Sequence, residues 1–571
     1  MPDPSALGLE VDGRQVEVAD DGSSLLDVLR EQLGLRSLKD GCSPQGQCGC
    51  CTVLVDGQPR VACVTPARRV RGRAITTLDG LAEGERAAWA EAFCATGASQ
   101  CGFCTPGIVL RLQALRAKGT APDDTRAVEQ ALLAHLCRCT GWRTILDAWR
   151  DHEPLPVPVA VPGSSSPPPS VASDADARRP PPDQNLEAGS QDLEGPRSRD
   201  RSADRDLDAA ARRASIEGRT RQRVAPDVAL GQGGFADDTA PPDALVAVPD
   251  GAGGWAVAET LATARAASGK VQGRRTTGEP IPPLDLPDGD WDAALRTTWV
   301  EPAYLELDAS WCAPGGEPVA PLANGGAFGG KTASLVAGVA RDIADRYGRA
   351  VRVVLSREDA VRMGPKRPPV AGGVRVDGTG VLRVVRTPGI AAAIHGVAPD
   401  LVVDEVDVPG PPTSVDLRAA GWAEASILLA AARAPRHEPA GPIETVSPEG
   451  AVVRAAAELG PEPVVRITVS CGAPLDHVVL RSYAIGAAHM ALGWVCSEGL
   501  AVDADGVVHD LTIRSFGVLR AVDTPRIDVE VVDDGGPPVN GSDAVFAAVA
   551  AAVWIAQGQP ADWPTGLRLR A

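Results

Sequence analysis

The chain has 571 residues, of which 44% are apolar, and a formal net charge of −18 at pH 7. This length predicts two to four domains, each with enough apolar material for its own core. The negative charge argues against binding to nucleic acid or to an anionic membrane surface, because only local basic patches could offset the repulsion. The first residues lack the basic and apolar regions of an export signal, and no run approaches about 18 apolar residues. We therefore expect a cytoplasmic protein without a membrane span.

Residues 6–77 alternate short apolar runs with turn signals. The dipeptides Asp12-Gly13 and Asp56-Gly57 each separate two such runs and predict hairpins. SLLDVLREQLG between them has helical periodicity, so we expect a small sheet crossed by one helix. From about residue 84 to 150 the apolar spacing is helical and predicts a compact bundle of four helices.

The stretch from residue 153 to about 226 is first rich in proline and serine and then mixed in charge. It has too few large apolar residues to offset its own ordering entropy, so we expect a disordered linker. Beyond about residue 240, apolar runs and Ala-rich helical stretches predict an α+β region of one or two lobes. The expected division is a sheet domain at 1–80, a helical domain at 81–152, a linker at 153–235 and the α+β region at 236–571.

Thirteen cysteines in a chain without an export signal indicate metal ligands or reactive thiols and not a disulfide framework. Ten of them precede residue 140, and nine of these form two groups, with Cys50 as an extra thiol in the first. The first group has spacings that resemble plant-type 2Fe–2S binding, in a glycine-rich loop that can wrap closely round a cluster. Its members are Cys42, Cys48, Cys51 and Cys63. The second group consists of a CxxC pair and a CxC pair at the mouths of helices, namely Cys101, Cys104, Cys137 and Cys139.

Structural zinc is the alternative for both groups, because zinc also takes four thiolates. Zinc sites usually use two similar knuckles, whereas the first group lies on one long wrapping loop and the second includes a tight CxC pair. The spacing therefore favours iron–sulfur clusters.

Three stretches, GCSPQGQCGCCTVLVDG, SQCGFCTPG and HLCRCTGWR, together resemble the iron–sulfur domain of the molybdenum hydroxylases, the xanthine dehydrogenase and aldehyde oxidase family. The match covers nearly all of residues 6–150 in the right order. It implies a ferredoxin-like β-grasp domain with one 2Fe–2S cluster and a four-helix domain with another, each held by one cysteine group. It also implies that Gln100 hydrogen-bonds the pterin of molybdopterin. The first spacing is one residue longer than usual, and Cys50 offers a competing thiolate.

NGGAFGGKT, at residues 324–332, fits the phosphate-loop pattern, but the prolines upstream argue against the buried strand that such a loop needs. GGAFGGK is also similar to the glycine-rich loop of the family's molybdopterin-binding subunit. VEPAYLELDA before it and VLSREDAVRMGPKRPPV and LRAAGWAEA after it agree with that subunit in order. This resemblance implies contacts to the cofactor from Gly326, Phe328, Gly329 and Arg418, and a shortened molybdopterin-binding-like domain.

The C-terminal half also departs from that subunit. It is far shorter, and the Gly-Gln-Gly segment that helps hold the pterin and the segment with the catalytic glutamate are both absent. Glu498 and Asp543 are carboxylates in this area, but neither lies in the required motif, and carboxylates are usually exposed, so no catalytic base is assigned. The linker replaces the FAD domain of some family members, so FAD is expected only in a partner chain.

We therefore expect an electron-transfer subunit of a molybdenum hydroxylase complex, with two 2Fe–2S clusters that relay electrons from a molybdenum–pterin site toward FAD. The expected partners in this hetero-oligomer are an intact molybdenum-binding catalytic subunit and a FAD-binding subunit. The C-terminal half would be a non-catalytic molybdopterin-domain homologue used for assembly, with molybdopterin at the interface or in the partner. One alternative is a self-contained small hydroxylase that binds its own molybdopterin. Another is a nucleotide-binding protein that uses the phosphate loop.

Overall fold

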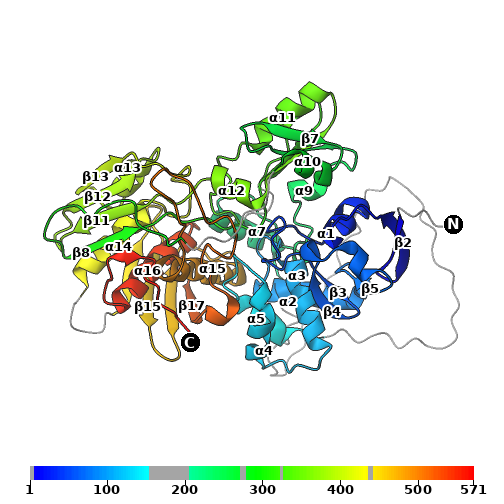
Figure 1. Cartoon of the computed structure of the whole chain (residues 1–571). Coiled ribbons are helices and arrows are strands. Elements are labelled where there is room, and N and C mark those ends of the chain that lie inside the picture. Colours follow the sequence, from blue (N-terminus) through cyan, green and yellow to red (C-terminus); the bar gives the residue numbers. More distant parts are fainter. Residues whose placement is uncertain (1–5, 154–204, 270–277, 322–325, 435–440, 571) are drawn as a thin grey trace, which may run out of the picture.

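The computed structural model describes residues 6–153, 205–269, 278–321, 326–434 and 441–570. Figure 1 shows the N-terminal sheet and the helices that follow it on one side of the molecule, and the C-terminal sheets on the other. A smaller lobe, drawn in green, lies at the top of the view. The chain is a mixed α+β protein of several domains, as the sequence predicts.

The N-terminal sheet has five strands in the order β2-β1-β5-β3-β4. The strands are β1 (Ala6–Val11), β2 (Arg14–Ala19), β3 (Thr52–Val55), β4 (Gln58–Val61) and β5 (Ala74–Thr76). Both predicted hairpins are confirmed, because β1 pairs with β2 and β3 with β4 in antiparallel register across turns with positive φ. The predicted helix is a short α1 (Leu25–Asp27), continued by the π-helical turn η1 (Val28–Gln32). Two 3-10 turns, η2 (Ala62–Val64) and η3 (Ala67–Val70), follow β4.

Four helices follow this sheet. They are α2 (Glu83–Thr96), α3 (Thr105–Arg116), α4 (Thr125–Ala131), extended by the turn η4 (Leu132–Ala134), and α5 (Arg143–Asp151). Trp89 of α2 stacks on Trp149 of α5 with ring centroids 6.4 Å apart, and the Arg116 guanidinium of α3 lies 3.9 Å from the Trp149 ring. This packing brings the start of α3 and the loop before α5, which carry the second cysteine group, into one region.

The expected disordered linker at residues 153–235 is wrong for residues 205–235, and residues 154–204 lie outside the described residues. Residues 205–235 contain α7 (Leu207–Gly218) and α8 (Pro226–Ala229), and α9 (Ala236–Thr239) follows. Arg213 of α7 is fully buried, lies 3.6 Å from Glu217 and donates to the Val539 carbonyl at 3.0 Å. The mixed charge that suggested disorder is partly neutralised inside the fold, which composition cannot reveal.

The smaller lobe is a four-stranded sheet in the order β7-β6-β10-β9, with a hydrophobic core of its own. Its strands are β6 (Leu245–Pro249), β7 (Trp255–Ala258), β9 (Ala309–Cys312) and β10 (Val351–Val354). Its helices are α10 (Leu261–Ala267) and α11 (Val336–Tyr347), and α12 (Arg357–Met363) follows β10.

Two more sheets form the C-terminal part, in the orders β13-β12-β11-β8-β18 and β14-β15-β16-β17. The strands are β8 (Ala293–Thr297), β11 (Val370–Val374), β12 (Gly380–Val385), β13 (Leu401–Val406), β14 (Ile443–Val446), β15 (Val452–Glu458), β16 (Val464–Ser470), β17 (Arg526–Val532) and β18 (Asp562–Trp563). The helices are α13 (Ile390–His395), α14 (Trp422–Arg433), α15 (His477–Cys496) and α16 (Ser542–Ala556), with the turn η5 (Ala521–Asp523).

Helix α15 packs against α16 and α7 and also touches α2. Within the described part of the chain it is the one helix long and apolar enough to cross a membrane, with a mean hydropathy of 1.2. However, 89% of that window is buried inside the protein, and a core helix meets the same criteria. The helix is therefore weak evidence for a span, and its contact with α2 makes it one of the elements that join the C-terminal part to the helical domain.

Candidate functional site

The first cysteine group lies on the loop between η1 and β3 and on η2, and all four thiols are buried. The exposed fractions are 1% for Cys42, Cys48 and Cys51 and 6% for Cys63. Gly49 in this loop has a φ of +73°, and a Cβ there would lie 2.5 Å from the His135 ring. Glycine is therefore required where the loop meets the helical domain.

Backbone N–H groups point at two sulfurs of this group. The N–H of Gln45 donates to Cys42 Sγ at 3.2 Å, and that of Cys63 donates to Cys51 Sγ at 3.4 Å. The Cys42 thiol is also hydrogen-bonded to Cys48 and Cys63, which holds its pKa well below the usual range of a thiol. Such donors favour the thiolate form that metal binding needs.

The extra thiol of Cys50 is 1% exposed and lies beside the same group. Its Sγ is 3.9 Å from the Cys48 carbonyl oxygen. A Cβ on Gly41 would lie 3.2 Å from both the Cys48 and Cys50 sulfurs, so these two thiols face the same backbone segment. Cys63, by contrast, is hydrogen-bonded to Cys42 and Cys51 and not to Cys50.

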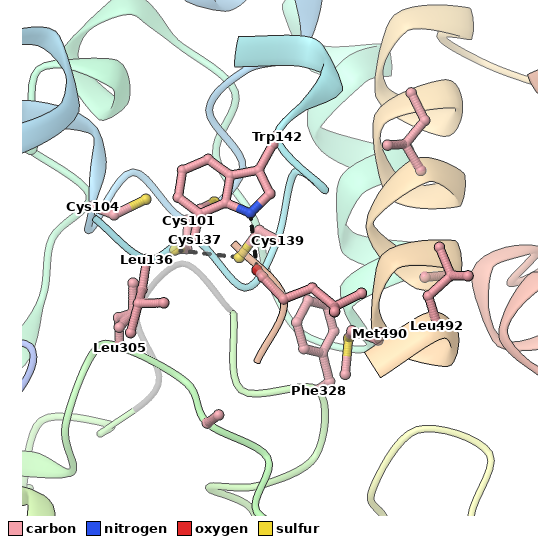
Figure 2. Packing of buried hydrophobic residues seen from close by; sticks show 14 of the residues in the cluster. Cys101, Cys104, Leu136, Cys137, Cys139, Trp142, Leu305, Phe328, Met490 and Leu492 are labelled. Carbon is pink, nitrogen blue, oxygen red and sulfur yellow. Dashed lines mark hydrogen bonds between the residues drawn. The ribbon is translucent and has the colours of Figure 1, made fainter. Parts of the chain in front are cut away.

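The second cysteine group joins the start of α3 to the loop before α5, and its thiols are at most 7% exposed. Figure 2 shows these sulfurs beside Trp142, with Phe328 and Met490 beyond Cys139. The sulfurs form two pairs. Cys139 Sγ lies 3.7 Å from Cys101 Sγ, and Cys104 hydrogen-bonds Cys137, which lowers the pKa of Cys137 to about 6.

Two sulfur pairs suit a 2Fe–2S cluster, in which four cysteines are shared between two irons. A structural zinc ion would gather four sulfurs at one tetrahedral centre. The arrangement therefore fits the iron–sulfur prediction better than the zinc alternative.

The two cysteine groups are connected by a direct backbone contact. The N–H of Leu136, next to Cys137, donates to the Cys48 carbonyl at 3.0 Å. His135 lies in the same junction, where its Nε2 is 3.2 Å from Thr52 Oγ1 and burial lowers its pKa to about 3. A neutral imidazole thus fills the space between the two groups.

Arg138, between the two cysteines of the CxC pair, forms a buried ion pair that the sequence did not reveal. Its Nη1 and Nη2 lie 2.5 and 2.6 Å from the Glu498 carboxylate, and its Nε donates to the Pro302 carbonyl at 3.0 Å. The expectation of exposed carboxylates is wrong for Glu498 and for Asp543, which are 1% and 3% exposed. A charged residue between two predicted ligands was the one signal that could have suggested a buried partner.

The glycine-rich loop reaches the second cysteine group. A Cβ on Gly326, where φ is +87°, would lie 3.1 Å from Cys101 Sγ. The Phe328 ring lies 4.1 Å under the Arg418 guanidinium, which in turn lies 3.3 Å from the Asp543 carboxylate. A Cβ on Gly329 would lie 1.9 Å from the Asp416 carbonyl oxygen. The structure therefore gathers the predicted residues Gly326, Phe328, Gly329 and Arg418.

Gln100 lies on the side of the second cysteine group that faces α15. Its Nε2 donates to the Cys139 carbonyl at 2.9 Å and to Ser482 Oγ at 3.0 Å. Tyr483 of α15 lines the same small cavity as Gln100. Burial, and then the charges of Cys139 and Cys101, raise the pKa of Tyr483 well above the usual range. The amide of Gln100 is thus engaged within the chain.

The phosphate-loop interpretation is contradicted by the position of Lys331. This side chain is buried, with its Nζ 3.1 Å from Glu306 Oε2 and 3.1 Å from the Pro321 carbonyl. Burial raises the pKa of Glu306 to about 7, while Lys331 opposes that shift. An ammonium group held inside the protein in this way cannot reach a nucleotide phosphate.

The described side chains leave little room for molybdopterin. The cavity lined by Phe328, Arg418 and Met490 measures about 30 Å³, and a second beside Gln100 and Tyr483 about 10 Å³. Such volumes hold roughly one to three water molecules. A tricyclic pterin with its phosphate is much larger, so these side chains, as they stand, do not fit that cofactor.

Two family models match the N-terminal part of the chain. The 2Fe-2S iron-sulfur cluster binding domain matches residues 9–74, and a second 2Fe-2S binding domain matches residues 77–150. These matches confirm two iron–sulfur domains, the first of them ferredoxin-like. They leave the individual cysteine ligands as predictions.

Curated relatives match the same part of the chain. The nicotinate dehydrogenase small FeS subunit of Eubacterium barkeri is 41% identical over 145 residues, which cover 25% of this chain and 90% of that protein. The xanthine dehydrogenase iron-sulfur-binding subunit of Escherichia coli O157:H7 is 42% identical over 134 residues, or 23% of this chain and 83% of that protein.

Solved structures resemble the whole chain in fold. The aldehyde oxidoreductase from Desulfovibrio gigas matches with a TM-score of 0.64 and covers 96% of this chain and 97% of that chain. The sequence identity in this match is 14%, so the likeness concerns the fold alone.

Proposed function

Because the chain belongs to the molybdenum hydroxylase family, that of xanthine dehydrogenase and aldehyde oxidase, we propose that it is an electron-transfer component of such an enzyme. Two 2Fe–2S clusters take electrons one at a time from a molybdenum–pterin site in a catalytic subunit and pass them toward FAD in another subunit. The first cluster is held by Cys42, Cys48, Cys51 and Cys63. The second is held by Cys101, Cys104, Cys137 and Cys139.

The observation that carries this proposal is the position of two buried cysteine groups on either side of one hydrogen bond. The Cys48 carbonyl accepts from the N–H of Leu136, which adjoins Cys137. Electrons exchanged between two clusters held in this way would pass through protein and not through water, because every proposed ligand is at most 7% exposed.

The bound clusters would supply reversible one-electron transfer. The chain supplies their environment. The N–H groups of Gln45 and Cys63 point at two sulfurs of the first group, and Thr140 Oγ1 lies 3.1 Å from Cys137 Sγ in the second. Hydrogen bonds to ligand sulfur stabilise the more negative, reduced cluster and so raise its potential.

The C-terminal α+β region has an assembly role in this proposal. Its narrow cavities beside Arg418 and Gln100 argue against a resident molybdopterin. Its contacts instead brace the second cysteine group, since Arg138 pairs with Glu498 and a Cβ on Gly486 of α15 would lie 1.8 Å from the Cys139 carbonyl oxygen. A rigid region attached to the second cluster is suited to dock the chain on an intact catalytic subunit.

Metal analysis and EPR spectroscopy of the purified full-length chain test the proposal. We expect about four irons per chain and two distinct 2Fe–2S signals after reduction. Cys48→Ser should remove one signal and Cys137→Ser the other. Cys312→Ser, a buried cysteine of the smaller lobe, is the matched control and should leave both.

Two outcomes would overturn parts of the proposal. Zinc in place of iron would exclude the clusters. Molybdenum stoichiometric with the isolated chain, together with turnover of an aldehyde or N-heterocycle, would instead favour a self-contained hydroxylase.

A further inference from the structure

A buried arginine of the C-terminal region contacts the loop of the first cysteine group. Arg357, the first residue of α12, is 0% exposed. Its Nη2 donates to the Gly41 carbonyl and to the Tyr304 carbonyl, each at 2.7 Å. Gly41 directly precedes Cys42, a proposed cluster ligand. A guanidinium is therefore held against the backbone of the loop that carries three of the four proposed ligands.

The residue that accepts this hydrogen bond also contacts the sulfurs of the loop. A Cβ on Gly41 would lie 3.2 Å from Cys48 Sγ and 3.2 Å from Cys50 Sγ. The guanidinium and these sulfurs thus meet the same glycine, with no water layer between them. Within a protein, at an effective dielectric constant of about 20, charges interact about four times more strongly than in bulk water.

The charge of Arg357 has no direct counter-charge among the described residues. The partners of its Nη2 are backbone carbonyls, and its Nε and Nη1 have none. Lys366, a buried cation nearby, instead pairs with Glu301 at 2.9 Å. The Asp308 carboxylate accepts from the Tyr304 hydroxyl, at the far end of that side chain from the carbonyl that Arg357 contacts. A buried cation in this state favours any negative charge that appears beside it.

We propose that Arg357 supplies the positive charge that stabilises the reduced first cluster, and so raises the reduction potential of that cluster. This inference rests on the proposed function. Reduction takes one electron from the molybdenum–pterin site and changes one cluster iron from Fe³⁺ to Fe²⁺, with no bond formed or broken in this chain. The cluster becomes more negative by one charge, and the guanidinium beyond Gly41 attracts that charge without having to move.

Arg357 also joins the cysteine loop to residue 304, so the test has to separate its charge from its hydrogen bonds. Arg357→Gln retains N–H donors for the two carbonyls and removes the charge. Arg357→Lys retains the charge and loses the planar fork of donors. The matched control is Arg514→Gln, because Arg514 donates to the Gln47 carbonyl of the same loop at 3.1 Å but is exposed, so that water and salt screen its charge.

Redox titration of the full-length protein, followed by EPR, measures the potential of each cluster. In Arg357→Gln we expect reduction of the first cluster to become at least tenfold less favourable, a fall of about 59 mV for one electron. Arg357→Lys should recover most of this loss. In Arg514→Gln the same equilibrium should change by less than about threefold. The potential of the second cluster should change by less than about threefold in all three variants, because Arg357 contacts the loop of the first group.

Three results would overturn the inference: a change below threefold in Arg357→Gln, an equal loss in Arg357→Gln and Arg357→Lys, or an equal loss in Arg357→Gln and Arg514→Gln. If Arg357→Gln loses the first cluster, Arg357→Lys decides. About four irons and a potential within threefold of the wild type then support the role of the charge, and loss of the cluster in Arg357→Lys as well overturns it. A wild type without any 2Fe–2S signal would show instead that the proposed function itself is wrong.

Discussion

Replacement of Glu498 by glutamine should loosen the second cysteine group, because it leaves the Arg138 guanidinium buried without its counter-charge. The two side chains are 4% and 1% exposed and are joined by two hydrogen bonds of 2.5 and 2.6 Å. Breaking a buried pair of this kind costs about 3–5 kcal/mol. Since about 1.4 kcal/mol corresponds to a tenfold change in an equilibrium constant, local opening should become roughly 100- to 4,000-fold more frequent.

Hydrogen exchange of the full-length protein measures this opening in peptides that cover residues 136–140 and 493–498. Arg71→Ala is the control, because it breaks an exposed pair with Asp20 that is worth at most about 1 kcal/mol. The double variant Arg138→Met/Glu498→Leu should regain most of the protection, since an apolar pair can replace a buried ion pair at little cost. A loss of protection below about threefold in Glu498→Gln, or no recovery in the double variant, would refute the reasoning.

Three further predictions concern single side chains. Burial lowers the pKa of His489 to about 3, so between that value and about 6.5 the unfolded chain binds a proton that the folded chain does not. Its contribution, up to about 5 kcal/mol, is present above pH 6.5 and lost as the pH falls toward 3, and His489→Gln should flatten this part of the pH dependence of thermal unfolding. If the thermal stability of His489→Gln falls between pH 6.5 and pH 3 as steeply as that of the wild type, this prediction is wrong. Cys50→Ala should keep about four irons per chain, because Cys50 is not a proposed ligand, whereas Cys51→Ser should lose the first cluster and keep about two. Iron analysis that gives the reverse result would make Cys50 the ligand in place of Cys51. Neither the wild type nor Lys331→Met should bind ATP in calorimetric titrations, because the Lys331 ammonium group is buried against Glu306. ATP binding by the wild type that disappears in Lys331→Met would instead support the phosphate-loop interpretation.

Local patterns predicted the N-terminal quarter of the chain well. Asp-Gly turns adopt the positive φ that a tight hairpin needs, and the four helices lie within the stretch from about residue 84 to 150 whose apolar spacing predicts them. The cysteine spacings predicted both groups, because ligands on one loop or at one helix end are close in space whatever the remaining fold. The sequence could not predict which sulfurs form pairs, because Cys101 and Cys139 come together only when α3 and α5 pack against each other.

Interactions between distant segments account for the parts that the sequence did not predict. Helix α7 looked disordered because Arg213 and Glu217 are hydrophilic on any scale, yet both are buried against residues more than 250 positions away. Glu498 looked like a surface carboxylate because its partner, Arg138, lies 360 positions earlier. A prediction from composition treats every charged residue as the average one, which is exposed to solvent. It therefore misses charged residues that are buried because they pair with a distant segment.

The glycine-rich loop shows how a family motif can persist for a reason other than catalysis. At Gly326 the backbone has a φ of +87° and passes so close to Cys101 Sγ that a side chain would press on the thiol. At Gly486 a Cβ would overlap the Cys139 carbonyl oxygen. Both glycines are therefore needed wherever this region packs on a second cluster, whether or not a pterin lies nearby. Their presence is evidence for the cluster and its contact with the C-terminal region, and it carries no weight in deciding whether that region performs hydroxylation.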